Sequence, residues 1–119
     1  MKKTIEQILE MAVLAHKKGN FQEAEELYRN ILRSNPLHSD TNHNLGVLAV
    51  SFNKFDKAIH FFETAIKSNP DVKQYWISYI DILIKNKNFV SANKAIEDGK
   101  KNGVFKSEHF QLFFQLQIH

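Results

Sequence analysis

The chain of 119 residues has no cysteine, only 4 glycines and only 2 prolines. The lack of cysteine excludes a disulfide scaffold, a thiolate zinc site and a cysteine nucleophile. Few glycines and prolines argue against a turn-rich β protein. No apolar run approaches the ~18 residues of a membrane span, and none follows the lysines after Met1 as it would in a signal peptide. We therefore expect a cytoplasmic protein with no membrane partner.

Neither positive nor negative residues dominate the sequence. The chain has 16 Lys and Arg against 13 Asp and Glu, and the net charge is +3. The basic residues are scattered along the chain, so we expect no nucleic-acid partner. Hydrophobic residues make up 43% and charged residues 24%, which is close to the average of globular proteins. The length is sufficient for one small domain, residues 1–119.

The sequence matches itself when it is shifted by 34 residues. Within each copy, apolar residues recur with the i, i+3, i+4, i+7 spacing of two consecutive helices. An aromatic residue, an alanine and, four residues after it, a large apolar residue recur in three copies: Phe21, Phe55 and Phe89; Ala24, Ala58 and Ala92; Tyr28, Phe62 and Ile96. This pattern predicts helices at about 4–17, 21–34, 39–52, 55–68, 72–86, 89–102 and 107–118.

The turn inside each pair needs a residue that tolerates a left-handed backbone. Gly19 and Asn53 suit that position in the first two copies. Lys87 occupies it in the third copy and fits poorly, so we expect that turn to be strained or altered. At the amino-terminal ends of the helices, Thr4 with Gln7 has the pattern of a capping box, and Asn20, Asp71, Asn88 and Ser107 are further candidate caps.

These columns resemble the tetratricopeptide repeat. The second copy carries the resemblance best, with Leu45-Gly46, Ala49, Ala58, Phe62 and the closing Pro70. The third copy departs from the family pattern, because Ile80 stands where a small residue is preferred and the closing proline is missing. The resemblance implies an all-α, right-handed α-solenoid of three hairpins, at about 5–38, 39–72 and 73–106, with a carboxy-terminal capping helix at about 107–118.

No motif for catalysis stands out. The sequence has no H-E-x-x-H, no glycine-rich phosphate loop and no G-x-S-x-G, so we expect no enzyme and no cofactor. Among the six histidines, His16 and His43 lie on neighbouring first helices and could face the same groove. The spacing supplies no third ligand, and zinc sites use three or four. We therefore expect no metal site.

The resemblance implies that the first helix of each pair lines a concave groove. Helical phase then selects the side chains that point into it. An apolar stripe on such a surface is typical of a partner site, although the same residues could instead pack helix against helix. The candidate peptide-binding residues are Leu9, Val13, His43, Asn44, Val47, Val50, Gln74, Ile77, Ser78 and Asp81.

Two sub-types of the family can be compared with this groove. Chaperone-tail binders hold a terminal carboxylate with a clamp of Lys, Asn and Arg, but Leu9, Val13, Gln74 and Ser78 stand at four of the five clamp positions. Because no cation is present to offset desolvation, we do not expect chaperone tails as partners. The second sub-type binds a peptide backbone with an asparagine ladder. Asn44 matches that position, while Glu10 and Ser78 occupy the neighbouring rungs.

The last predicted helix is apolar all round, which does not suit a solvated cap. We therefore expect Phe110, Phe114, Leu116 and Ile118 to meet a second copy of the chain, as in a homodimer, or a further domain. The segment from Tyr75 to Asp81 also resembles repeats that precede bacterial glycosyltransferase and sulfotransferase domains. Two functions follow: a non-catalytic scaffold for a protein or peptide partner, or an accessory oligomerisation module of a larger enzyme such as a glycosyltransferase.

Overall fold

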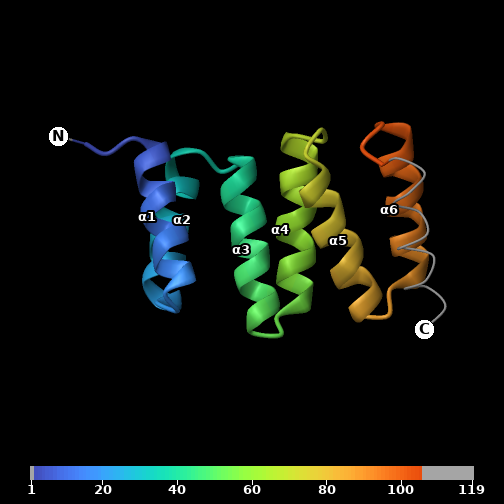
Figure 1. Ribbon diagram of the computed structural model, residues 1–119, viewed down its shortest axis with the longest axis horizontal. Coiled ribbons are helices and arrows are strands. Elements are labelled where there is room, and N and C mark those ends of the chain that lie inside the picture. The colour runs from blue at the N-terminus through green and yellow to red at the C-terminus, as the bar shows by residue number, and fades with distance from the viewer. Residues whose placement is uncertain (1, 106–119) are drawn as a thin grey trace.

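The computed structural model describes residues 2–105, which form an elongated stack of helices measuring 50 × 27 × 20 Å (Figure 1). Each predicted helix in this range is present, and its ends differ from the prediction by at most one residue. The predicted helix at 107–118 lies outside the described residues. The six helices are α1 (Ile5–Lys17), α2 (Phe21–Ser34), α3 (Ser39–Ser51), α4 (Phe55–Ser68), α5 (Lys73–Lys85) and α6 (Phe89–Lys101).

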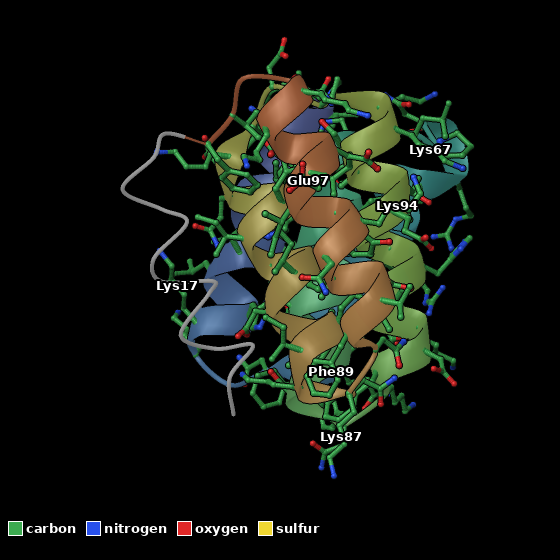
Figure 2. The ribbon with its side chains drawn as sticks, turned by 90° about the vertical axis from the view of Figure 1, so that its right-hand side faces the viewer. Lys17, Lys67, Lys87, Phe89, Lys94 and Glu97 are labelled. Atoms are coloured by element: carbon green, nitrogen blue, oxygen red, sulfur yellow. The ribbon has the colours of Figure 1, made fainter. Side chains whose placement is uncertain are left out.

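The helices pack as three sequential hairpins, α1–α2, α3–α4 and α5–α6. Helix α2 also contacts α3 of the following hairpin, and α4 contacts α5 in the same way. Helix α1 contacts α3 as α3 contacts α5. Seen along the stack, the blue α1 and the yellow α5 lie on one side and the second helices α2 and α4 on the other (Figure 2). We call these sides the first-helix face and the second-helix face. The fold is therefore the all-α repeat architecture that the sequence predicts.

Large buried side chains fill the space between hairpins. Tyr28 of α2 is 1% exposed and belongs to a core cluster with residues of α1 and α3. Phe62 of α4 is equally buried and forms a cluster with Ala49 of α3 and Ile82 of α5. A third cluster joins α5 and α6 around Trp76, Ile80 and Ile96. These apolar layers explain why single hairpins, which cannot bury their own faces, stack in a row.

Gly46 has a specific packing role in α3. A Cβ atom at this position would lie 2.4 Å from Cε1 of Phe62. No real side chain accepts so short a contact, and the Phe62 ring is too deeply buried to move aside freely. The lack of a side chain at Gly46 therefore leaves room for the Phe62 ring of α4.

The three hairpin turns share one backbone conformation. Gly19, Asn53 and Lys87 all have a positive φ, of 83°, 58° and 62°. In each turn the residue that follows donates its backbone N–H to a carbonyl five residues earlier, at 2.8–2.9 Å. The third turn is thus not altered as the sequence analysis allowed. It is strained instead, because a left-handed residue with a Cβ atom costs roughly 1–2 kcal/mol.

The predicted helix caps are only partly present. Thr4 and Gln7 form the capping box, with bonds of 2.9 and 3.1 Å. Asn20 and Asn88 precede their helices but make no side-chain cap, and Val72 rather than Asp71 occupies the cap position of α5. The α3 cap was missed. It is His38, whose Nδ1 accepts from the backbone N–H of Thr41 at 3.3 Å. An imidazole is not among the usual capping groups, so residue type alone does not mark His38 as a cap.

Candidate functional site

The predicted apolar residues of the first-helix face are partly committed to packing. Leu9 and Val13 lie against the core cluster of the first hairpin. Val50 packs against the cluster around Phe62, and Ile77 against the cluster around Trp76. Val47 differs, since 36% of it is exposed. Each of the four packed residues is half-buried, so each joins neighbouring helices and still presents an edge to solvent.

Polar side chains connect α3 to α5 on the same face. The Nε2 atom of His43 lies 2.8 Å from the Ser78 hydroxyl oxygen. Gln74 donates its side-chain N–H to the same oxygen at 3.2 Å. Because a hydroxyl can accept one bond and donate another, Ser78 can give its proton to a neutral His43. The structure therefore brings together three of the predicted site residues.

Tyr75 completes this network, although it was not among the predicted site residues. Its hydroxyl donates a hydrogen bond to Asp40. The centre of its ring lies 5.0 Å from the centre of the His43 ring. The ring centre of Phe62 lies 5.4 Å from that of His43. A sequence signal did exist: the Asp40–Tyr75 and His43–Ser78 contacts each join residues 35 positions apart, one step beyond the repeat. Aromatic residues at this spacing are ordinarily core, and Tyr75 is itself only 3% exposed.

The enclosure of the network changes its titration. Burial lowers the pKa of His43, and the hydrogen bond with Asn44 and the charge of Asp40 oppose that change without cancelling it. Burial also raises the pKa of Tyr75 to about 12, and the hydrogen bond to Asp40 acts in the same direction. At neutral pH both groups are therefore uncharged. The network can donate and accept hydrogen bonds but holds no buried positive charge.

The remaining predicted residues lie beside this network. Asn44 is half-buried on α3, next to His43. Asp81 forms an ion pair with Lys85 one turn along α5, at 3.1 Å. Ser78, which occupies a rung of the expected ladder, is already bonded to His43 and Gln74. Asn44 is thus the ladder position whose amide is best suited to a peptide backbone.

The two histidines of the metal hypothesis make different contacts. His16 Nδ1 lies 3.2 Å from the Tyr28 hydroxyl, and its ring meets the edge of Phe21 at 5.8 Å. Burial lowers the pKa of His16. Within residues 2–105, no three His, Asp or Glu side chains come together as a metal site would require. None of the helices in this range has the length and apolar composition that a membrane-spanning segment needs. The predicted interface residues Phe110, Phe114, Leu116 and Ile118 lie outside the described residues.

Comparison with known proteins identifies the repeat. The sequence model of the tetratricopeptide repeat family matches residues 15–78, which is more than half of the chain. The chain belongs to the tetratricopeptide repeat family.

Solved structures share the fold at low sequence identity. The secretion chaperone SycD of Yersinia enterocolitica, in complex with a peptide of the translocator YopD, has a TM-score of 0.77 and 16% identity, over 98% of this chain and 88% of that one. The TPR2B domain of yeast Sti1, in complex with pHsp70, has a TM-score of 0.78 and 16% identity, over 95% and 94%. Pseudomonas aeruginosa PilF has a TM-score of 0.76 and 17% identity, over 95% and 52%. At these identities the similarity establishes the fold alone.

Proposed function

We propose that this chain is a non-catalytic scaffold that holds an extended peptide or a partner helix along its first-helix face. The observation that carries the proposal is the α3–α5 network, which presents neutral polar groups beside the exposed edge of Val47. Neutral donors and acceptors suit a peptide backbone, whereas a terminal carboxylate would need cations. The half-buried aliphatic residues on either side supply apolar contact.

The structural neighbours support a peptide ligand. Two of them were solved with such a partner, a YopD peptide in SycD and pHsp70 in the Sti1 domain. In this chain Asn44 is the residue proposed to hold a backbone amide, with His43 and Ser78 fixing its surroundings. The absence of a basic clamp argues for an internal peptide segment and against a free chain terminus.

A peptide-display selection on the full chain tests the proposal. Selected peptides are then measured by isothermal titration against the wild type, Asn44→Ala and Val47→Glu. Loss of one backbone hydrogen bond in Asn44→Ala corresponds to about 1 kcal/mol, or roughly fivefold weaker binding. Val47→Glu should weaken binding more, because it places a charge against an apolar contact. Arg33→Ala, an exposed change on the second-helix face, serves as the control. Peptides that bind all variants equally would refute the assignment.

The second function, an accessory module that assembles or positions a larger enzyme, rests on the apolar pattern of residues 110–118. Sedimentation equilibrium over a wide concentration range tests it directly. A dimer that Phe114→Gln and Leu116→Gln convert to a monomer would favour assembly. A monomer at all concentrations would leave the peptide scaffold as the function of the chain.

A further inference from the structure

A pocket opens on the second-helix face, between α4 and α6, with a volume of about 420 Å³. Trp76 and Tyr79 of α5 line it, together with Ile66 of α4 and Ala95 of α6. This volume lies within the usual range for small-ligand sites. The pocket is on the opposite side of the stack from the His43 network, so the peptide scaffold proposed above does not use it.

The corresponding place one repeat earlier is almost closed. Between α2 and α4 the space measures only about 50 Å³, and Phe61 lines it. The Phe61 side chain packs against the core cluster of the first hairpin. In the repeat alignment Ala95 takes the place of Phe61, 34 residues later. The fold therefore has a position that a phenyl ring fills in one junction and that an alanine leaves open in the next.

Charged side chains on the rim of the pocket differ in their pairing within residues 2–105. Glu63 accepts a hydrogen bond from the Tyr79 hydroxyl at 3.2 Å, and Asp98 accepts one from Lys94 at 3.2 Å. Both rim carboxylates are thus engaged. Within residues 2–105, no carboxylate lies at ion-pair distance from Lys67, which is exposed near the carboxyl end of α4. Lys67 and Lys94 lie on the same side of the molecule (Figure 2).

We infer that this pocket is a second binding site, which accepts an aromatic side chain of a partner protein carrying an acidic residue next to it. The aromatic ring would occupy the space that Phe61 fills in the preceding junction, against the apolar wall of Trp76, Ile66 and Ala95. The adjacent carboxylate would pair with Lys67, which supplies charge of the required sign. The two faces of the solenoid would then hold separate partner segments.

The chain offers a direct probe, because Trp76 is its single tryptophan and lines the pocket. A hydrogen bond of 2.8 Å from its indole N–H to the Pro70 carbonyl fixes the ring. The full chain labelled with 5-fluorotryptophan gives one ¹⁹F signal, which is titrated with N-acetyl-Phe-Asp-amide. A saturable shift is expected, with a Kd on the order of 1 mM for so small a ligand. N-acetyl-Ala-Asp-amide should bind at least about tenfold more weakly, since it has no phenyl ring to bury in the pocket.

Variants separate this site from others. Ala95→Phe copies the filled junction and should abolish the shift, and Ser91→Phe on the exposed rim tests the same blockade if Ala95→Phe does not fold. Lys67→Gln should weaken the Phe-Asp ligand by about threefold and leave N-acetyl-Phe-Asn-amide unchanged. Arg33→Ala, an exposed change on α2 outside the pocket, is the control and should bind normally.

Three results would overturn the inference. One is a ¹⁹F signal that does not move up to about 10 mM ligand, well above the expected Kd. Another is a shift of the wild-type size in the blocked variants, which would place the ligand elsewhere. The third is a signal that moves with protein concentration alone, because a second copy of the chain would then be the occupant.

Discussion

The second and third repeats fill the equivalent place between their two helices with differently sized pairs of residues. In the second, Gly46 of α3 leaves room for the ring of Phe62 on α4. In the third, the equivalent residues are Ile80 on α5 and Ile96 on α6, which belong to one buried cluster. One repeat pairs a very small residue with a very large one, and the other pairs two of medium size. What the fold requires is the combined volume of the pair.

This comparison explains a departure from the family pattern. Ile80 replaces the small residue expected at its position, yet it is 0% exposed and part of a continuous core. Such a replacement is tolerated when the facing residue shrinks in compensation, because interiors are packed at nearly constant density. Taken alone, Ile80 therefore departs from the family preference for a small residue at this position. Ile80 and Ile96 together nevertheless belong to one buried core cluster.

The largest predicted effect comes from breaking this pairing. Gly46→Ala should lower the free energy of unfolding by about 1–3 kcal/mol, because its Cβ atom would lie 2.4 Å from the Phe62 ring. This is expected although alanine is the better helix former. Urea denaturation with fluorescence detection measures the loss.

A double-mutant cycle sharpens the result. Phe62→Ile leaves a cavity on its own and should also destabilise. Combined with Gly46→Ala it shifts the pair toward the more equal sizes of the third repeat, so the double variant should lose less than the two single variants together, by about 1 kcal/mol or more. Losses that simply add would show that Gly46 and Phe62 are not coupled.

A smaller effect of opposite sign is predicted at the hairpin turns. Lys87→Gly should stabilise the chain by about 0.5–1 kcal/mol, since relief of the positive φ outweighs the greater entropy of an unfolded glycine. Gly19→Ala, the inverse change in the first turn, should destabilise. The midpoint of thermal unfolding, compared for both variants, measures the pair. A Lys87→Gly variant that is less stable than the wild type would mean that the Lys87 side chain makes a contribution larger than the strain.

Helices and turns were predictable because they depend on local pattern. Apolar spacing gave every described helix, and the recurrence of Gly19, Asn53 and Lys87 gave the turns. The α3–α5 network was only partly predictable. His43 and Ser78 follow from helical phase, but the Tyr75–Asp40 bond depends on how far one hairpin is rotated against the next, which no single repeat encodes. The pocket between α4 and α6 was not predicted, because Ala95 has the pattern of an ordinary core residue until it is compared with Phe61.

The smallest predicted effect is a pH dependence that differs between hairpins. Burial lowers the pKa of both His43 and His16 below the ordinary value of 6.5. Just below pH 6.5, His43 and His16 are therefore protonated to a greater extent in the unfolded chain than in the folded chain. Stability is then full above pH 6.5 and falls as the pH drops from 6.5 toward the folded pKa values. Urea denaturation at several values between pH 5 and pH 8 measures this slope.

Two variants test how much each hairpin contributes to the pH dependence of the free energy of unfolding. His43→Gln retains an amide that can bond Ser78 and should flatten the pH dependence in part, whatever it does to stability at pH 8. His16→Gln should remove the contribution of the first hairpin to the pH dependence of the free energy of unfolding. His43 should account for the larger share, because it is enclosed between the rings of Phe62 and Tyr75, while His16 meets Phe21 and Tyr28 only edge-on. Its enclosure joins two repeats, so acid should loosen the α3–α5 contact on which the proposed peptide site depends. A slope that survives in His43→Gln would instead assign the acid sensitivity to the first hairpin and leave the peptide site intact at low pH.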